Sequence, residues 1–188
     1  MCILVEVLSN QESQGEPEER KSIDAPIKIR EAQTEDLPEL LDIYNYTVRT
    51  STATFQLEPL TLEERQPWFA SHRGRYPLLV AEAESGTVAG YCCISPFRHS
   101  GGYAGTVENS IYVHKDFRRK GIAFMLMKEI IARAKELGYH AIIACIAGSN
   151  EPSIRLHEQL GFEFSGRLKQ VGFKFSRWED DVFYQLIL

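Results

Sequence analysis

The segment Arg118-Arg119-Lys120-Gly121-Ile122-Ala123 is a short basic glycine turn between two stretches of different periodicity. Residues 107–113 alternate as in a strand, and the residues after the turn repeat apolar side chains at helical spacing. This order predicts a strand, a turn and a helix, whose first N–H groups and dipole attract a phosphate or diphosphate. The spacing is neither that of GxxxxGK[ST] nor that of GxGxxG. A solvated helix start is the simpler alternative for the turn taken alone.

The bulk composition limits the classes of protein to which the chain can belong. With 188 residues, 44% of them hydrophobic, it can form one domain with a sizeable core. The formal net charge of −5 argues against a nucleic-acid partner, since phosphate-backbone binding needs a basic surface. Residues 1–8 lack the features of a signal peptide, and no apolar run is long enough to cross a membrane. The sequence therefore predicts a cytoplasmic protein with no membrane partner.

The cysteines indicate packing rather than chemistry. Cys2, Cys92, Cys93 and Cys145 form no C-x-x-C pair, so neither a zinc site nor a thioredoxin-type pair is indicated, and no metal is expected. The last three lie in apolar strand patterns. We expect them to be reduced residues of the core.

The N-terminal half divides into an arm and the start of a domain. Residues 9–26 are polar and charged, so residues 1–26 are predicted to be a flexible arm ahead of a domain over 27–188. Within the domain, the pattern predicts a strand at 27–30 and then a helix capped by Thr34. Further signals are a second helix opened by the capping box Thr61-x-x-Glu64 and a hairpin around Ser85-Gly86.

The C-terminal half predicts helices alternating with strands. The helix after the basic turn ends at Gly138, and residues 141–147 form an apolar strand expected to be covered on both faces. A short helix at about 151–160 and closing strands near 162–170 and 181–188 complete a mixed α/β sheet. The apolar stripe of the first of these helices is predicted to be Ala123, Leu126, Met127, Ile130, Ile131, Ala134 and Leu137.

Three ordered segments together resemble one family. They are the basic turn, the run Asn150-x-x-Ser153-x-x-Leu156-His157-x-x-x-Gly161-Phe162, and the pair formed by 106–113 and 171–180. In this order they resemble the GNAT superfamily of N-acetyltransferases, and within it the phosphinothricin acetyltransferase-like branch, over about 27–188. Taken alone, Asn150 is equally a helix N-cap and His157 a helix-face residue.

The resemblance implies a fold, a co-substrate and a set of site residues. The implied fold is a mixed, mostly antiparallel twisted sheet flanked by about four helices, and the implied co-substrate is acetyl-CoA. Substrate contacts are implied for Gly102, Tyr103 and Glu108. Acetyl-CoA contacts are implied for Ile111, Tyr112, Val113, Arg118, Arg119, Lys120, Gly121, Ile122, Ala123, Phe124, Asn150 and Ser153.

Glu108 and His157 are the residues expected to act in catalysis. A protonated amine cannot attack a thioester, and the resemblance implies that Glu108 accepts its proton directly or through one water. An ordinary solvent-facing strand residue is the alternative for Glu108. His157 stands where the family often has a tyrosine that protonates the departing thiolate, so it is expected either to donate that proton or to bind the substrate.

The expected activity is acetyl transfer to the primary amine of a small molecule. The resemblance implies an amino acid or an analogue of the phosphinothricin or methionine sulfone/sulfoximine type, and a chain able to form a homodimer. Relatives commonly carry an arginine shortly before the segment at 106–113, whereas residues 101–105 here are Gly-Gly-Tyr-Ala-Gly. The particular amine therefore stays open. The alternatives are a non-catalytic acyl-CoA-binding module and an acetyltransferase of protein N-termini or lysines.

Overall fold

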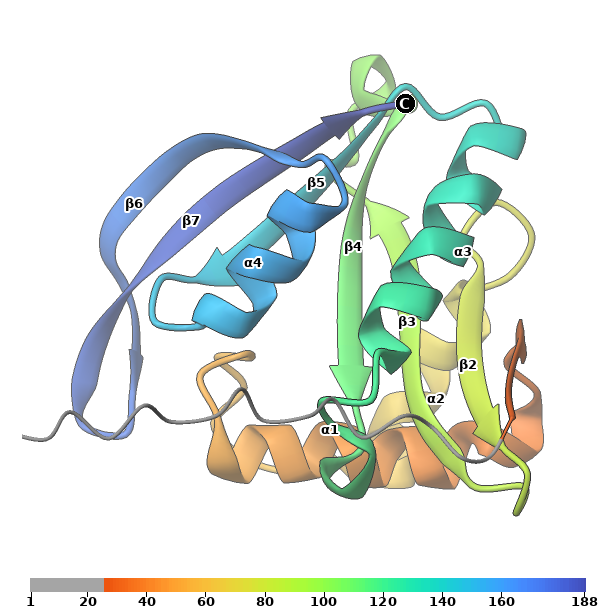
Figure 1. Ribbon diagram of the computed structural model, residues 1–188. Helices are drawn as coiled ribbons and strands as arrows, with labels where there is room; N and C mark the ends of the chain where they lie inside the picture. Colours follow the sequence, from red (N-terminus) through yellow and green to blue (C-terminus); the bar gives the residue numbers. More distant parts are fainter. Residues whose placement is uncertain (1–25) are drawn as a thin grey trace, which may run out of the picture.

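Alternating apolar residues and glycine turns fold residues 26–188, which the computed structural model describes, into one sheet with helices on both faces (Figure 1). The helices are α1 (Leu37–Thr50), α2 (Leu62–Ser71), α3 (Ile122–Glu136) and α4 (Glu151–Gln159). The strands are β1 (Ile27–Glu31), β2 (Leu78–Ala83), β3 (Val88–Pro96), β4 (Thr106–Val113), β5 (Ala141–Ala147), β6 (Glu163–Lys174) and β7 (Arg177–Ile187).

The sheet order is β1-β2-β3-β4-β5-β7-β6. Neighbours pair antiparallel except β4 and β5, which are parallel because α3 crosses over between them. This arrangement confirms the predicted mixed, mostly antiparallel sheet with four helices. The parallel β4–β5 pair lies in the middle of the sheet. The antiparallel strands β1 to β4 lie on one side of this junction, and the antiparallel strands β5, β7 and β6 lie on the other.

Two apolar layers hold the helices on the sheet. On one face, α3 packs through Leu126 and Ile130 against strand residues such as Ile142, all fully buried. On the other face, Leu40 of α1 and Phe69 of α2 pack against residues of β2 and β3. Burial of an apolar side chain contributes about 1.5–3 kcal/mol, so these layers fix the position of every element around the β4–β5 junction.

Several local signals have the predicted geometry. The Thr61 hydroxyl accepts from the Glu64 N–H at 3.2 Å, and the Glu64 carboxylate accepts from the Thr61 N–H at 2.7 Å, which confirms the capping box. Gly86 turns the β2–β3 hairpin with φ of 83°, and Gly138 follows α3 with φ of 77°. Glycine adopts these left-handed angles without a Cβ clash.

Two predictions about helix ends were wrong. Thr34 does not cap a helix: residues Thr34–Asp36 form a 3₁₀ turn and α1 begins at Leu37. Gln33 is the N-cap of this turn, and its N–H donates to the Asp36 carboxylate at 2.7 Å. In α3, Leu137 lies beyond the last helical turn and is exposed, whereas Ile122 at the start of the helix is buried.

The closing hairpin is longer than predicted. Strands β6 and β7 continue to a two-residue turn at Phe175-Ser176, where Lys174 pairs with Arg177. Both turn residues have positive φ, 50° and 59°, which is the geometry of a primed hairpin turn. Asn-Gly is the usual sequence signal for that turn, so Phe-Ser gave no indication of it.

The cysteine and arm predictions have different outcomes. Cys92 and Cys93 are buried free thiols, whereas Cys145 is exposed and so is not the core residue that was predicted. The predicted arm over 1–26 and Cys2 lie, except for residue 26, outside the described residues.

Within residues 26–188 no helix is long and apolar enough to span a membrane, and no three His, Cys, Asp or Glu side chains are grouped to hold a metal ion.

Candidate active site

The sheet opens where β4 and β5 meet. Their parallel pairing covers only Thr106–Glu108 against Ala141–Ile143, and beyond it the two strands diverge (Figure 1). A cavity of about 190 Å³ lies in this opening. Its walls come from the loop after α1, from β4, from β5, and from α4 with its N-cap. The lining residues are Ala53, Glu108, Asn109, Ser110, Ile111, Tyr112, Ala144, Cys145, Ile146, Ala147, Asn150, Ser153 and His157.

A larger cavity of about 400 Å³ lies elsewhere, between the end of β1 and α2. Its walls include Glu31, Glu35, His72 and Arg73, and none of the catalytic, substrate-binding or acetyl-CoA-binding residues expected from the sequence. Size alone is a weak guide to function. The cavity at the β4–β5 opening is the candidate site, because it gathers residues from two of the sequence motifs.

Glu108 stands at the closed end of the opening, on the last residue pair that joins β4 to β5. Its side chain is half-buried. Burial raises the pKa of Glu108 above its ordinary value, and repulsion from the carboxylate of Asp181 raises it further. A carboxylate with a raised pKa holds a proton more strongly, which suits it to remove one from an amine.

Asp181 and Cys145 were not predicted from the sequence to lie at the site. Glu108 pairs with Ile143 and Asp181 with Ala147, so Glu108, Cys145 and Asp181 share one face of the sheet. Cys145 is exposed at the surface but lines the cavity wall, and partial burial there, followed by the charges of Asp181 and Glu108, raises the pKa of its thiol to about 12. The thiol therefore stays protonated at neutral pH, and the negative charge beside the cavity belongs to the two carboxylates.

His157 lies on α4 with only 1% of its surface exposed. Its Nδ1 is 2.8 Å from the carbonyl oxygen of Ser153, and its Nε2 is 3.0 Å from the side-chain nitrogen of Asn109. Its ring also packs edge-on against Phe162 at 4.9 Å between ring centroids. Burial lowers the pKa of His157. The imidazole is therefore neutral at pH 7, and both of its nitrogens have partners.

The edge of β4 that faces β5 is open beyond Glu108. Among the described residues, no strand pairs with this edge after Glu108, so its peptide groups face the cavity. Ile111 and Tyr112 line the cavity, whereas Val113 lies past it and pairs with Gly90 of β3. Unpaired strand N–H groups can donate to a carbonyl oxygen that develops negative charge.

The basic turn leads from the end of β4 into α3 and has the shape of an anion site. Gly121 is the N-cap of α3 with φ of 78°, and a Cβ there would meet no atom within 4 Å. Arg118 lies over the ring of Tyr46 at 5.3 Å, and Lys120 over the ring of Phe117 at 5.1 Å. The first N–H groups of a helix have no intrahelical partner. Open space, free N–H groups and cations fit a diphosphate.

Ile122, Ala123 and Phe124 form the first turn of α3, so their N–H groups are available there. The side chain of Ile122 is buried in the core, and only its backbone can contact a ligand. Asn150 is the N-cap of α4, and its side-chain oxygen accepts from the Ser153 N–H at 3.4 Å. Both Asn150 and Ser153 also line the cavity, so the cap and a ligand contact are compatible.

Gly102 and Tyr103, predicted to contact the substrate, do not line the cavity. They belong to an exposed 3₁₀ turn before β4, where Tyr103 packs against Phe97 at 5.8 Å between ring centroids. Their contact with a substrate stays a prediction. The loop residue Ala53, which does line the cavity, was missed because no sequence motif marks it.

Comparisons with known proteins agree on one family. The model of the acetyltransferase (GNAT) family matches residues 40–162. An L-methionine sulfoximine/L-methionine sulfone acetyltransferase of Pseudomonas paraeruginosa is 46% identical over 161 residues, which are 85% of this chain and 94% of that protein.

Two solved structures are similar over most of their length. A GNAT superfamily phosphinothricin acetyltransferase from Sinorhizobium meliloti in complex with acetyl-CoA superposes with a TM-score of 0.84 at 39% identity, covering 86% of this chain and 88% of that one. A ribosomal-protein-alanine N-acetyltransferase from Brucella melitensis has a TM-score of 0.83 at 44% identity, covering 86% and 99%.

Proposed function

The chain belongs to the acetyltransferase (GNAT) family and is an acetyl-CoA-dependent N-acetyltransferase, and from this premise we propose that it acetylates the primary amine of an amino acid or amino-acid analogue with Glu108 as general base. The observation that carries the proposal is the position of Glu108. It is a half-buried carboxylate with a raised pKa at the closed end of the cavity, beside the open edge of β4.

Glu108 is proposed to take one proton from the substrate ammonium, directly or through a water. The nitrogen lone pair thereby becomes available to form the bond to the acetyl carbon. A general base contributes about 10²–10⁴-fold to such a rate. Acetyl-CoA supplies an acetyl thioester, whose C–S bond breaks as the C–N bond forms.

The open edge of β4 is proposed to donate N–H groups to the acetyl oxygen as negative charge develops there. Each such donor contributes about 3 kcal/mol at comparable sites. The turn from Arg118 to Gly121 and the first turn of α3 are proposed to hold the diphosphate. Asn150 and Ser153 are proposed to contact the part of acetyl-CoA that joins its diphosphate to its acetyl group.

His157 was predicted to protonate the departing thiolate or to bind the substrate. Its Nδ1 hydrogen is used by the Ser153 carbonyl, and its Nε2 accepts from Asn109. These contacts support a positioning role, in which His157 ties α4 to β4 across the back of the cavity. The thiolate then takes its proton from solvent or from the protonated Glu108, and the nitrogen loses its second proton to solvent after the C–N bond has formed.

The choice of acceptor rests on the relatives' names. A 46% identical protein is a methionine sulfoximine/methionine sulfone acetyltransferase, and a 39% identical structure is a phosphinothricin acetyltransferase. We therefore propose an amino-acid analogue of this type. One observation favours a second candidate: a 44% identical structure bears the name of a ribosomal-protein-alanine N-acetyltransferase, so a peptide N-terminus is the alternative acceptor.

A thiol-release assay with a panel of amines tests the proposal. The panel holds methionine sulfoximine, methionine sulfone, phosphinothricin, a neutral alkylamine and a peptide beginning with alanine. Rapid release with the first three compounds is expected. Release only with the peptide would select the alternative acceptor. No release with any amine, while calorimetry shows acetyl-CoA binding, would indicate a non-catalytic acyl-CoA-binding module.

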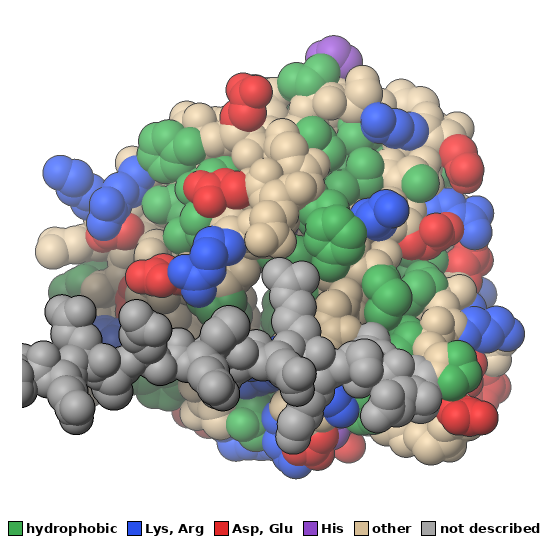
Figure 2. Space-filling view, in the orientation of Figure 1, with side chains coloured by type: hydrophobic (Ala, Val, Ile, Leu, Met, Phe, Trp, Pro, Cys, Tyr) green, Lys and Arg blue, Asp and Glu red, His purple; other side chains and the backbone are tan. Residues whose placement is uncertain are grey.

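A homodimer formed through the β6–β7 hairpin is also proposed. Strand β6 is at the edge of the sheet, and six large apolar side chains on the hairpin are 50–59% exposed. Apolar side chains reach the surface over this hairpin, at the left of Figure 2. They are Phe164, Leu168, Val171, Phe173, Phe175 and Trp178.

A second copy of the chain is the proposed partner, because a two-fold axis lets one edge strand and one apolar patch cover themselves. Light scattering of the Phe173→Ser/Trp178→Ser variant should show a smaller mass than the wild type. Leu137→Ser, which removes an exposed leucine elsewhere, should leave the mass unchanged. A monomeric wild type would contradict the dimer.

The boundary of the catalytic domain is proposed to lie at Ile27, where β1 begins. A chain starting at Ala25 should then keep the thiol-release activity of the full chain. Loss of activity in this shorter, folded chain would assign residues 1–24 to the site or to the dimer. The cytoplasmic location stays a prediction.

A further inference from the structure

Lys174, the last residue of β6, is a buried lysine between two exposed phenylalanines. Its neighbours Phe173 and Phe175 are 50% and 52% exposed, whereas Lys174 is 4% exposed. Its ammonium donates to the carbonyl oxygens of Ser51 at 2.8 Å and Thr54 at 2.7 Å. Within residues 26–188 no carboxylate forms an ion pair with it. The side chain therefore reaches away from the hairpin surface to the loop after α1.

The end of α1 explains why a charge is tolerated there. Burial lowers the pKa of Lys174, because a desolvated ammonium is less stable than a hydrated one. Ser51 is the C-cap of α1, and the carbonyl end of a helix carries partial negative charge. Two short hydrogen bonds and this dipole offset the desolvation. The Lys174 ammonium is thus bound at the C-terminal end of α1.

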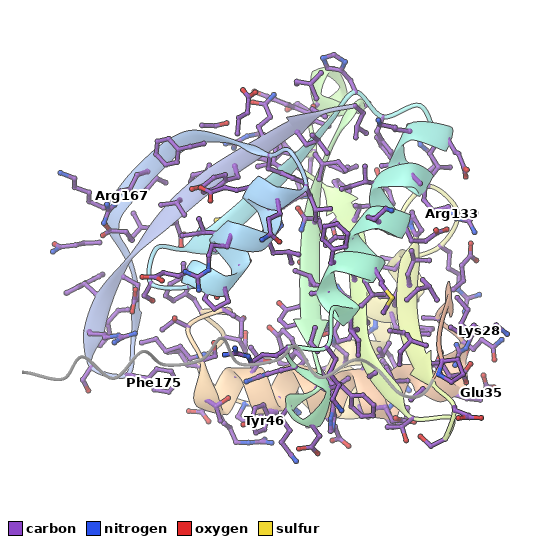
Figure 3. The ribbon with its side chains drawn as sticks, in the orientation of Figure 1. Lys28, Glu35, Tyr46, Arg133, Arg167 and Phe175 are labelled. Carbon is purple, nitrogen blue, oxygen red and sulfur yellow. The ribbon has the colours of Figure 1, made fainter. Side chains whose placement is uncertain are left out.

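Two further contacts join the same loop to the β5–β7 half of the sheet. The ring of Phe55 covers Gly172, where an added Cβ would lie only 2.3 Å from a ring carbon. The hydroxyl of Thr52 is 3.3 Å from that of Ser149, just before the N-cap of α4. Figure 1 shows this loop between the end of α1 and the tip of the hairpin, and Figure 3 labels Phe175 at that tip.

The other side of the loop touches the β4 half. The hydroxyl of Thr54 is 3.2 Å from that of Tyr44, whose ring meets Tyr112 edge-on at 5.6 Å between centroids. Tyr112 and the loop residue Ala53 both line the cavity that holds Glu108. Loop 51–56 therefore spans the opening between β4 and β5 and forms one wall of the site.

We propose that Lys174 is a positioning residue for the acceptor: its ammonium holds loop 51–56 across the β4–β5 opening and so determines how tightly the acceptor amine is bound, without taking part in acetyl transfer. This inference rests on the small amine acceptor proposed above. Gly172 contributes to the same arrangement, because only a glycine leaves room for the ring of Phe55.

Three variants separate the ammonium from the rest of the side chain. Lys174→Met keeps an apolar stem of similar length, Lys174→Arg restores a cation, and Lys169→Met removes an exposed charge from the same strand. With methionine sulfoximine as acceptor, Lys174→Met should raise the KM for the acceptor about 10–100-fold, the effect of losing hydrogen bonds to a charged group. The kcat and the KM for acetyl-CoA should change less than about 3-fold. Lys174→Arg should recover part of the loss, and Lys169→Met should match the wild type.

Hydrogen exchange gives a readout that needs no acceptor. The amides of residues 51–56 should exchange faster in Lys174→Met than in Lys169→Met, with the core unchanged. Unchanged exchange, or faster exchange with an unaltered acceptor KM, would overturn the proposal. A fall in kcat with both KM values unchanged would also overturn it, since that pattern indicates only a smaller folded fraction. If methionine sulfoximine is not acetylated by the wild type, the acceptor assignment fails separately, and the kinetic comparison uses the amine that does release thiol.

Discussion

The side-chain nitrogen of Asn109 on β4 lies 3.0 Å from Nε2 of His157 on α4, a contact that fits the histidine tautomer with its hydrogen on Nδ1. On its other side, Nδ1 is 2.8 Å from the carbonyl oxygen of Ser153, which can only accept. Nδ1 therefore carries the hydrogen, and Nε2 accepts from the Asn109 amide. Neutral His157 thus has no free hydrogen to give to a thiolate in the cavity.

His157→Gln should lower stability and leave turnover nearly intact. The change leaves buried hydrogen-bonding groups of Asn109 and Ser153 without their partner, which costs about 1–3 kcal/mol. We expect a lower Tm by thermal denaturation and a kcat within about 3-fold of the wild type.

His72 offers a matched control, because it is buried on the other face of the sheet with both nitrogens bonded, at 2.7 Å to Trp68 and 3.0 Å to Ser95. His72→Gln should show a similar loss of Tm. If only His157→Gln loses kcat by about 10²-fold or more, the proton-donor role predicted from the sequence is restored.

Most of the fold was predictable because its signals act over a few residues. The capping box at Thr61 and Glu64, the glycine turn at Gly86 and the helix stop at Gly138 each have a local physical cause. The β6–β7 hairpin was predicted too short, since its positive-φ turn at Phe175-Ser176 contains neither glycine nor asparagine. Sequence patterns report such turns only when they use the residues that favour them.

The candidate site was predictable only in part. Glu108, Asn150 and His157 come from motifs and do line one cavity. The positions of Asp181 and Lys174 beside the site were not predicted, because they depend on strand register and on long-range contacts. The face that a strand residue presents depends on register, and Lys174 contacts Ser51, which lies 123 positions away. Such long-range contacts leave no pattern in one sequence.

Gly121→Val should weaken acetyl-CoA binding. A side chain at φ of 78° strains the backbone, and its atoms would fill the space above the first turn of α3. Loss of one or two charge-assisted hydrogen bonds corresponds to about 10–100-fold in affinity, measured by calorimetry.

Gly86→Val is the matched control for this change, because Gly86 has φ of 83° and equally open surroundings in the β2–β3 turn. Both variants should lose about 1–2 kcal/mol of stability from the left-handed angle. Only Gly121→Val should lose acetyl-CoA affinity. Equal affinity in the two folded variants would exclude the turn as the diphosphate site.

Asp181→Asn should move the acid limb of the pH–rate profile to lower pH. Burial is the main cause of the raised pKa of Glu108, and the charge of Asp181 is the second. Removing that charge lowers the pKa of Glu108, so the base stays deprotonated down to a lower pH. The value of kcat/KM therefore begins to fall only at that lower pH. Asp42→Asn on the exposed side of α1 should leave the profile unchanged. An unshifted profile in folded Asp181→Asn would mean that another group limits the acid limb.

Glu108→Gln separates catalysis from binding. Glutamine keeps the size of the side chain and its place at the last β4–β5 pair, but it cannot accept the ammonium proton. At neutral pH we expect turnover to fall by roughly 10²–10⁴-fold, with an acetyl-CoA affinity close to that of the wild type. Glu84→Gln, in the exposed turn after β2, should change neither quantity.

The pH dependence of the Glu108→Gln variant identifies the cause of its loss. If Glu108 is the base, the deficit should shrink as pH rises, because more of the acceptor amine then arrives without its proton. A deficit of the same size at every pH would instead assign Glu108 to substrate positioning. Near-wild-type turnover at neutral pH would make it a structural residue of β4, and a lower Tm would then be its main effect. Since burial and Asp181 already hold the pKa of Glu108 above its ordinary value, we expect the first outcome.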